Sequence, residues 1–312
     1  MILSVSRRTD IPNYYSEWFY NRVREGFLYV RNPLNPRQIS RIPISPDVVD
    51  CIVFWTKNPA AMLPGLGQLE DYKYYFQFTI TGYGCDMEPN LPDKRNQVIR
   101  TFRQLSEWLG PNRVIWRYDP ILLNERYTID YHIRAFREIA CQLNGYTGKV
   151  VISFIDAYTK IKRQMRENRI RELCQEEMLY LAAAMAETAA LYQMKIETCA
   201  EHIDLSRIGI RHGSCIDKSV IETITGYRIK AAKDRNQRPE CGCIESMDAG
   251  SYDTCMNGCL YCYANSSSTG VAAAVSRYDA NSPLLCGVIG EEDRITERKV
   301  TLLRENQISL FD

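Results

Sequence analysis

Residues 114–154 read VIWRYDPILLNERYTIDYHIRAFREIACQLNGYTGKVVISF. This segment begins and ends with short apolar runs, Val114–Tyr118 and Val150–Phe154, whose length and composition predict buried strands. Between them, Asp130–Leu143 predicts a helix. A strand, a helix and a second strand in succession are typical of a βα unit on a parallel sheet.

The same alternation continues on both sides of this segment. Four further apolar runs predict strands: Ile2–Ser6, Cys51–Thr56, Tyr74–Ile80 and Lys195–Cys199. Three further segments predict helices: Tyr14–Glu25, Lys94–Leu109 and Arg169–Tyr192. No Gly-rich dinucleotide fingerprint follows the first strand. The six predicted strands therefore favour an α/β fold of the partial (β/α)6 TIM-like barrel type, with a doubly wound sheet as the alternative.

Length and composition indicate one main domain, because the chain has 312 residues, of which 45% are hydrophobic. We expect the barrel in residues 1–227 and a cysteine-rich, cluster-binding segment in residues 228–312. Lys plus Arg number 39 against 38 for Asp plus Glu. This net charge creates no global field for nucleic acid or a membrane, and a nucleic-acid partner stays open only through a local patch. No apolar segment suits a signal peptide or a membrane span, which predicts a cytoplasmic protein.

The 12 cysteines are the unusual feature of the composition, since a reducing compartment keeps thiols available for metals or catalysis. Five of them fall in residues 241–262, which read CGCIESMDAGSYDTCMNGCLYC. Cys255, Cys259 and Cys262 in this segment have CxxxCxxC spacing. Three thiolates in one tight loop can hold three corners of a [4Fe–4S] cluster. The fourth iron is then open for chemistry.

This spacing, with Tyr261 directly before Cys262, resembles the CxxxCx(aromatic)C signature of the radical S-adenosylmethionine (SAM) superfamily. The resemblance implies that SAM chelates the open iron and that Tyr261 packs near its adenine. It also implies that an electron from the cluster cleaves SAM to a 5′-deoxyadenosyl radical, which abstracts hydrogen from an unknown substrate. An electron donor such as flavodoxin or ferredoxin is the expected partner.

Three further segments, SVSRRTDIP (4–12), FWTKNP (54–59) and WRYDP (116–120), extend the comparison. Together with the cysteine segment, they make the chain similar, up to about Asn265, to a bacterial family of unknown function that carries the signature near its C-terminus. A weaker similarity, in Arg117–Pro120 and Tyr261–Tyr263, is to spore photoproduct lyase, a radical SAM enzyme of DNA repair.

Two features depart from the superfamily pattern. The cysteine motif follows six predicted strands instead of the first, and no Gly-Gly-Glu run is present to bind the methionine amine. A C-terminal loop that folds over the barrel mouth would still bring its cluster to the usual place. We therefore expect this loop to dock near the strand-end residues Lys57, Arg117 and Glu197.

Polar residues at the carboxyl ends of the strands are the candidate site residues, because the active sites of parallel barrels lie there. They are Ser6, Arg7, Thr56, Lys57, Thr79, Thr81, Arg117, Asp119, Ser153, Asp156, Glu197 and Glu201. Arg117 is the expected carboxylate clamp, with a structural Arg117–Asp119 pair as the alternative. Glu197 is expected to bind a ribose diol or an amine. Lys57 and Asp119 complete the predicted catalytic set.

The remaining cysteines divide into two groups. Four are predicted to form a second four-thiolate centre, such as another [4Fe–4S] cluster, with simple buried thiols as the alternative: Cys199, Cys215, Cys241 and Cys243. A zinc knot that joins Cys241 and Cys243 to two of the later cysteines is a further alternative. Five have no cysteine neighbour at ligand spacing and are expected to be small buried residues: Cys51, Cys85, Cys141, Cys174 and Cys286.

Three functions are consistent with these patterns. The first is a radical SAM-type enzyme, the second an iron–sulfur redox or sensor protein without SAM chemistry, and the third a zinc-stabilised nucleic-acid-binding protein. His202 and His212 lie beside Glu201 and near Cys215, but lone histidines are more often surface or hydrogen-bonded residues than catalysts. The substrate class stays open among peptides, nucleic acids and small metabolites.

Overall fold

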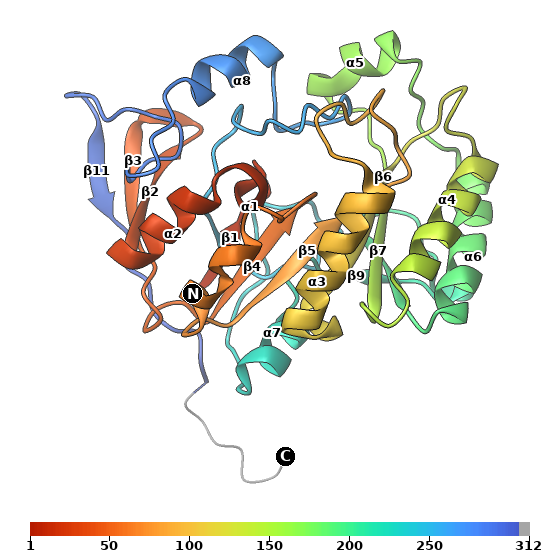
Figure 1. Cartoon of the computed structure of the whole chain (residues 1–312), viewed down its shortest axis with the longest axis horizontal. Helices are drawn as coiled ribbons and strands as arrows, with labels where there is room; N and C mark the ends of the chain where they lie inside the picture. The colour runs from red at the N-terminus through yellow and green to blue at the C-terminus, as the bar shows by residue number, and fades with distance from the viewer. Residues whose placement is uncertain (306–312) are drawn as a thin grey trace.

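The computed structural model describes residues 1–305 (Figure 1). Its central element is a sheet of eight strands in which all neighbouring strands are parallel. From edge to edge the strands are β10 (Met247–Asp248), β1 (Ile2–Val5), β4 (Cys51–Thr56), β5 (Tyr74–Thr79), β6 (Val114–Ile121), β7 (Lys149–Phe154), β8 (Lys195–Cys199) and β9 (Arg211–Gly213). The predicted α/β class is confirmed, and the six predicted strands occur within a few residues of their expected ends.

The order of the strands separates the two predicted topologies. From β1 to β9 the strands of the large sheet follow one another in chain order, so every crossover advances in the same direction. A doubly wound sheet instead reverses direction at a switch point, and these strands do not. Strands β9 and β10 form opposite edges, so within residues 1–305 the sheet is open and does not close into a barrel.

A second sheet has three strands in the order β11-β3-β2. Its strands are β2 (Phe27–Asn32), β3 (Asn35–Pro43) and β11 (Arg294–Glu297). Strands β2 and β3 form an antiparallel hairpin, and β11 lies parallel to β3. The sequence prediction missed this sheet because β3 begins with exposed residues, Asn-Pro-Arg-Gln, and lacks the apolar run that identifies a buried strand.

Helices connect the strands. The α-helices are α1 (Ile11–Tyr14), α2 (Ser16–Glu25), α3 (Ile99–Leu109), α4 (Ile129–Gln142), α5 (Lys162–Glu167), α6 (Gln175–Leu191), α7 (Lys218–Thr225) and α8 (Ser268–Val275). Shorter turns of helix are η1 (Leu63–Leu69), η2 (Lys94–Val98), η3 (Pro111–Arg113), η4 (Thr159–Ile161) and η5 (Ser206–Ile208). The helix predicted from Arg169 begins only at Gln175. Arg169 has a φ of +51°, which no α-helix allows, and Arg171 pairs with Leu123 as an isolated β-bridge.

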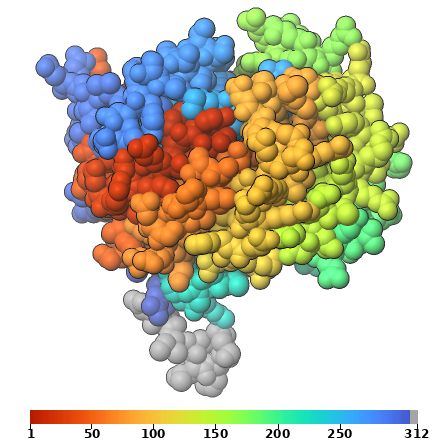
Figure 2. Space-filling model, in the orientation of Figure 1, coloured from red at the N-terminus to blue at the C-terminus, as the bar shows by residue number. Residues whose placement is uncertain are grey.

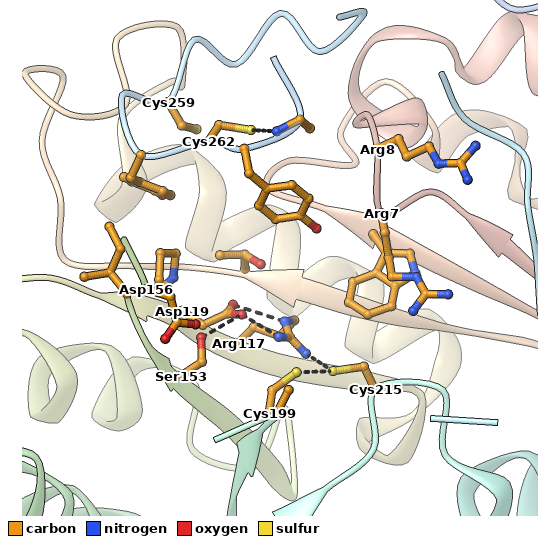
Figure 3. A pocket seen from close by; sticks show the side chains of 18 of the residues that line it. Arg7, Arg8, Arg117, Asp119, Ser153, Asp156, Cys199, Cys215, Cys259 and Cys262 are labelled. Atoms are coloured by element: carbon orange, nitrogen blue, oxygen red, sulfur yellow. Dashed lines mark hydrogen bonds and ion pairs between the residues drawn. The ribbon is translucent and has the colours of Figure 1, made fainter. Parts of the chain in front are cut away.

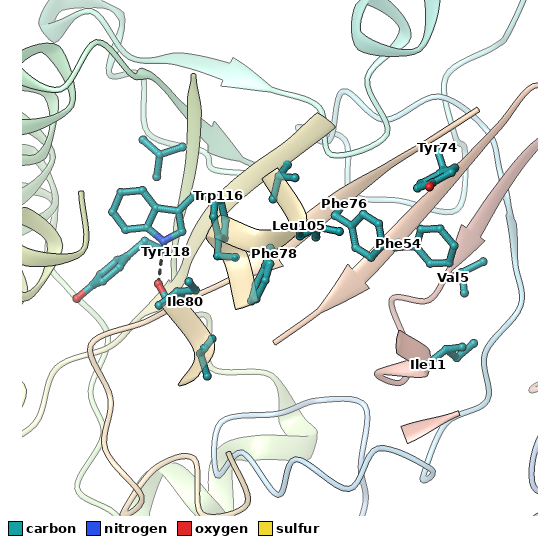
Figure 4. Close-up of a cluster of buried hydrophobic side chains, with 14 of the residues drawn as sticks. Val5, Ile11, Phe54, Tyr74, Phe76, Phe78, Ile80, Leu105, Trp116 and Tyr118 are labelled. Carbon is teal, nitrogen blue, oxygen red and sulfur yellow. Dashed lines mark hydrogen bonds between the residues drawn. The ribbon is translucent and has the colours of Figure 1, made fainter. Parts of the chain in front are cut away.

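One face of the large sheet packs against α2, α3, α4 and α6. Alternate strand residues point to this face, among them the fully buried Phe54, Phe76 and Trp116. Phe54 stacks on Phe76 with ring centroids 4.7 Å apart, and Trp116 stacks on Phe136 of α4 at the same distance. Figure 4 shows this row of side chains across the strands. Burial of such large rings is a major contribution to the stability of the fold.

The opposite face is covered by α7 and by irregular chain. Its strand residues Tyr75, Ile115 and Val151 belong to one buried cluster with Ile221 of α7 and with apolar and cysteine side chains between residues 215 and 244. The cysteine-rich segment therefore takes the place that a helical layer occupies in a doubly wound fold.

The C-terminal part of the chain returns to the N-terminal part. Strand β10 pairs with β1, Trp18 Nε1 donates to the Ser282 carbonyl at 2.8 Å, and the N-terminal ammonium group donates to the Thr301 carbonyl at 2.7 Å. Residues after 266 (blue) accordingly border the N-terminal surface (red) in Figure 2. The last part of the expected C-terminal segment, residues 306–312, lies outside the described residues. Across residues 1–305, no helix has the length and apolar character needed to span a bilayer.

Candidate functional site

A cavity of about 340 Å³ lies at the carboxyl end of the large parallel sheet (Figure 3). Its wall contains residues at the ends of β1, β4, β5, β6, β7 and β8. Of the predicted strand-end residues, all except Thr81 and Glu197 line it. Cys255, Cys259 and Cys262 also line it, so the C-terminal cysteine loop lies over the strand ends. Figure 3 shows Cys259 and Cys262 on one side of this cavity and Cys199 and Cys215 on the opposite side.

A tight turn inside the loop of Cys255, Cys259 and Cys262 requires glycine. Gly258 has a φ of +69°, which favours glycine, and a Cβ atom there would lie 3.0 Å from Asn90 Nδ2. Asn90 Nδ2 donates to the Met256 carbonyl at 2.7 Å, and the Leu260 amide donates to the Met87 carbonyl at 3.0 Å. The loop is thus attached to the chain that follows β5.

Asp10 and Asn257 attach the same loop to the chain that follows β1. The buried Asp10 carboxylate accepts from Asn257 Nδ2 at 3.0 Å and from the Lys57 amide at 2.8 Å. Asn257 Oδ1 in turn accepts from Asn13 Nδ2 and from the Tyr14 hydroxyl at 3.1 and 3.0 Å. A network of buried and partly buried hydrogen bonds therefore joins chain segments that are about 250 residues apart.

The three thiols of the loop are in a buried environment with backbone donors. Burial raises the pKa of the Cys255 thiol to about 12 and also raises the pKa values of Cys259 and Cys262. These thiols therefore hold their protons at neutral pH, so a bound metal would have to displace the protons. The Ala264 amide points to Cys262 Sγ at 3.4 Å, a donor that would stabilise a thiolate.

Lys57 and Glu88 form a buried ion pair next to the loop. Lys57 Nζ lies 2.7 Å from Glu88 Oε1 and donates to the Tyr261 hydroxyl at 2.9 Å. Lys94 pairs with the other oxygen of Glu88. Burial alone would raise the pKa of Glu88, but the two ammonium groups outweigh it and lower the pKa to about 2. Glu88 is therefore ionised, and it holds both Lys57 and Tyr261 in place.

Tyr261 is the aromatic residue of the signature. Its hydroxyl also donates to Glu88, its ring centroid lies 5.5 Å from that of Tyr83, and only 6% of its surface is exposed. It lines the cavity, but hydrogen bonds and packing already fix its orientation. An adenine, as the resemblance implies, could therefore contact only the edge of the Tyr261 ring that faces the cavity.

The four other predicted ligands also come together, although they belong to separate segments. Cys199 ends β8, Cys215 follows β9, and Cys241 and Cys243 precede β10. The sulfur atoms of Cys199 and Cys215 lie 3.0 Å apart. Cys215 and Cys241 each make a hydrogen-bond contact with Cys243. The zinc grouping that joins Cys241 and Cys243 to the later cysteines is not formed, because these two cysteines contact Cys215 and its neighbour instead.

Arg117 is paired, as the structural alternative predicted. Its Nε donates to Asp119 Oδ1 at 3.1 Å, and its Nη1 donates to Cys215 Sγ at 2.7 Å and to Gln77 Oε1 at 3.3 Å. The side chain is 4% exposed. It therefore has little free donor capacity for the carboxylate of a cofactor, and the structure does not support its role as a clamp.

Glu197 lies outside the cavity and is not placed for its predicted roles. Its two oxygens lie 2.5 Å from Lys149 Nζ and 2.6 Å from Lys195 Nζ, at the other end of the strands. It shares a face of β8 with the cavity-lining Cys199, but it lies two residues earlier on the strand, within reach of Lys149 and Lys195 at the strand starts. Glu201 does line the cavity, and burial, with Asp156 and Asp119 nearby, raises its pKa to about 7.

The other titratable candidates lie elsewhere. His202 is exposed and lies 3.0 Å from Glu240, and His212 is bonded to Thr198 Oγ1 at 3.0 Å. Cys51 and Cys286 are buried as expected. The prediction was wrong for three cysteines, which are exposed: Cys85, Cys141 and Cys174. Cys141 lies on the amphipathic helix α4, where burial depends on the face rather than on the residue type, and Cys174 is the N-cap residue just before α6.

Sequence reasoning missed Asp10, Glu88 and Arg8. Asp10 was part of the quoted SVSRRTDIP segment, so its place in a recognisable motif was the available signal. Glu88 lies in a loop and has no local signal, because its partners are distant in sequence. Arg8 lines the cavity next to Arg7 and forms no ion pair with any described residue, which leaves its guanidinium available.

The cysteine loop fits a cluster in its donor set: three thiols, backbone donors and one shared cavity wall. Among residues 1–305, no group of three or more His, Cys, Asp or Glu side chains already has the spacing of a completed metal site. Ligand binding would therefore require small side-chain rotations.

Comparisons with known proteins address the family alone. No significant match was found among curated proteins or among solved structures. A family model described as "Domain of unknown function (DUF1848)" matches residues 2–264, which include both groups of cysteines and all the strand ends around the cavity. The chain therefore belongs to the DUF1848 family.

Proposed function

We propose that the chain is a radical SAM-type enzyme in which Cys255, Cys259 and Cys262 hold a [4Fe–4S] cluster. One observation carries this proposal: the three cysteines share one wall of a cavity that the polar carboxyl ends of the strands also line. An electron-transfer cluster would normally have four protein thiolates, and a structural zinc knot would need no cavity. The consecutive order of the strands supports the partial (β/α)6 barrel as the fold on which this chemistry occurs.

When bound, the cluster and SAM would supply a 5′-deoxyadenosyl radical for hydrogen abstraction from a substrate. The residues of the chain itself would bind and orient the cofactor and the substrate, and they would exclude water from the cavity. Asp10 and Asn257 fix the loop, and Glu88 holds Lys57 against it. This arrangement places one buried ammonium group beside the cysteines, where it offsets negative charge on thiolates.

We assign to Arg8 the role of carboxylate clamp, which the sequence suggested for Arg117. Its guanidinium lies over the Tyr252 ring, 5.2 Å from the centroid, and its only hydrogen bond among the described residues is a long one, 3.4 Å, to the Gly250 carbonyl. A guanidinium with free donors in a cavity suits a carboxylate, either of SAM or of an acidic substrate. The proposed chemistry needs a reducing compartment, which the cytoplasm provides, and an electron donor such as flavodoxin or ferredoxin.

The decisive test is anaerobic reconstitution of the full chain with iron and sulfide, followed by addition of SAM and dithionite. We expect 5′-deoxyadenosine, measured by mass spectrometry, only when both SAM and reductant are present. A reconstituted cluster that gives no 5′-deoxyadenosine, and whose EPR spectrum does not change with SAM, would contradict the proposal and favour a redox or sensor protein. Failure to bind iron, with zinc in its place, would favour the zinc-stabilised protein.

A further inference from the structure

Four cysteines on the wall opposite the proposed cluster are not explained by the proposed function. The sulfurs of Cys199 and Cys215 lie 3.0 Å apart, and Cys241 and Cys243 pack in the same buried cluster, where both interact with Cys215. Three of them are at most 6% exposed. Isolated buried cysteines, such as Cys51, are explained as small apolar residues. That explanation does not account for four thiols that three separate segments bring together.

Two of these sulfurs accept hydrogen bonds from groups that would stabilise a thiolate, although contacts among the thiols and burial raise the pKa values of Cys199, Cys215 and Cys243. Arg117 Nη1 donates to Cys215 Sγ at 2.7 Å, and the Ile216 amide donates to Cys243 Sγ at 3.3 Å. The Cys215 carbonyl is held by the Tyr75 hydroxyl and by Gln77 Nε2, both at 2.7 Å. A guanidinium and an amide that point to sulfur stabilise negative charge there. The backbone around Cys215 is fixed, so its sulfur has little freedom to move away.

We propose that these four thiolates bind one Zn²⁺ ion in a closed, tetrahedral structural site. Four sulfurs about 2.3 Å from one ion lie about 3.8 Å from one another, so only a small rotation of Cys199 or Cys215 is needed. A four-iron cluster would place Cys199 and Cys215 on different corners, much further apart than the 3.0 Å that separates their sulfurs. Four protein ligands leave no open position, so the ion stabilises structure and does not act on substrate.

The site would fasten the segment of Cys241 and Cys243 to the ends of β8 and β9. This segment forms part of the cavity wall, and no regular strand or helix holds it there. The zinc site is independent of the proposed cluster, since the two sets of ligands share no residue.

The test measures zinc and iron by mass spectrometry in the full chain purified without oxygen. We expect about one zinc per chain in the unaltered protein, in Cys259→Ala and in the exposed-cysteine control Cys141→Ala. We expect the zinc content of Cys215→Ala and Cys243→Ala to fall at least tenfold, whereas both variants should keep the cluster iron. Cys259→Ala should show the reverse pattern, so a failure of the cluster assignment and a failure of the zinc site are distinguishable.

Zinc content that is unchanged in Cys215→Ala and Cys243→Ala would overturn the proposal. So would a second set of four irons that is lost in these variants, or a single iron in place of zinc. If these variants do not fold, Co²⁺ substitution in Cys259→Ala provides the second measurement. The intense charge-transfer absorption of a four-thiolate Co²⁺ site is then expected, and its absence would equally overturn the proposal.

Discussion

The two groups of cysteines face each other across one cavity, yet they are built in opposite ways. Cys255, Cys259 and Cys262 lie within eight consecutive residues, whereas the other four come from the end of β8, the chain after β9 and the chain before β10. The first group has three ligands and faces open volume. The second has four, and Arg117 closes it on one side. A short loop suits an open reactive centre, and ligands from distant segments suit a closed structural one.

This difference predicts distinct consequences when ligands are removed. Replacement of Cys255, Cys259 or Cys262 with Ala should abolish SAM cleavage completely, because each supplies one thiolate of the three. The measurement is 5′-deoxyadenosine formation together with iron content, with Cys141→Ala as the exposed control. Full iron and an unchanged EPR signal in any of the three variants would remove the distinction between the two groups.

The polar support of the loop is expected to contribute to global stability. Glu88→Ala leaves Lys57 and Lys94 without their buried partner, and removal of one member of a buried ion pair costs about 3–5 kcal/mol. The matched control is Glu138→Ala, whose pair with Arg95 is exposed and is worth about 0–1 kcal/mol. Urea unfolding measures both. Equal losses in the two variants would show that Glu88 is not a supporting residue.

Acid should lower the free energy of unfolding through His132, on the helix-covered face of the sheet, independently of any effect on the metal sites. Burial lowers the pKa of His132 from 6.5 to about 4, and its ring lies between the Tyr118 hydroxyl and the Leu122 carbonyl. Because the folded pKa is the lower one, the unfolded chain takes up the proton first as the pH falls. The fold should then lose up to about 3 kcal/mol between pH 6.5 and 4.

His132→Gln should flatten this pH dependence, whereas His202→Gln, at an exposed position, should not. Unfolding free energies at several pH values give the slopes, and iron content at each pH separates loss of metal from loss of the fold. An unchanged slope in His132→Gln would assign the acid sensitivity to other groups.

Asn257 tests whether the loop needs its attachment to the chain after β1. Asn257→Ala removes one donor from the buried Asp10 carboxylate and the acceptor of the half-buried Tyr14 hydroxyl, at a cost of about 1–3 kcal/mol. We expect faster loss of cluster iron to a chelator. Asn90→Ala, which removes one exposed hydrogen bond to the same loop, should change the rate much less. Similar rates in the two variants would contradict this account of the attachment.

Arg8 is expected to produce the smallest effect. Arg8→Met should weaken SAM binding about tenfold, the loss expected for one charge-assisted contact, with partial recovery in Arg8→Lys. Binding to the reconstituted protein is measured by the SAM-induced change in the EPR spectrum. An unchanged affinity in Arg8→Met would mean that Arg8 serves the substrate or no ligand.

Particular residues show how far prediction from sequence reached. The run Cys51–Thr56, CIVFWT, was assigned to its exact bounds, because a continuous apolar run of this length is typical of a buried parallel strand. Glu197 was misplaced although its strand was right, since it lies in the middle of β8 and only Cys199, two residues further on, reaches the cavity at the strand end. The sequence left two roles open for Arg117, a carboxylate clamp or a structural pair with Asp119. Its hydrogen bonds to Asp119 and Cys215 favour the structural role.

The sequence by itself determined the parallel α/β fold and the three-cysteine loop, because strand burial and CxxxCxxC spacing are local properties of the chain. Only the tertiary structure decided that the loop lies over the strand ends, that Glu88 pairs with Lys57 and that four distant cysteines meet beside Arg117. These are contacts between residues separated by tens to hundreds of positions, and no local pattern records them. Packing of the C-terminal segment on the second face of the sheet brings them together.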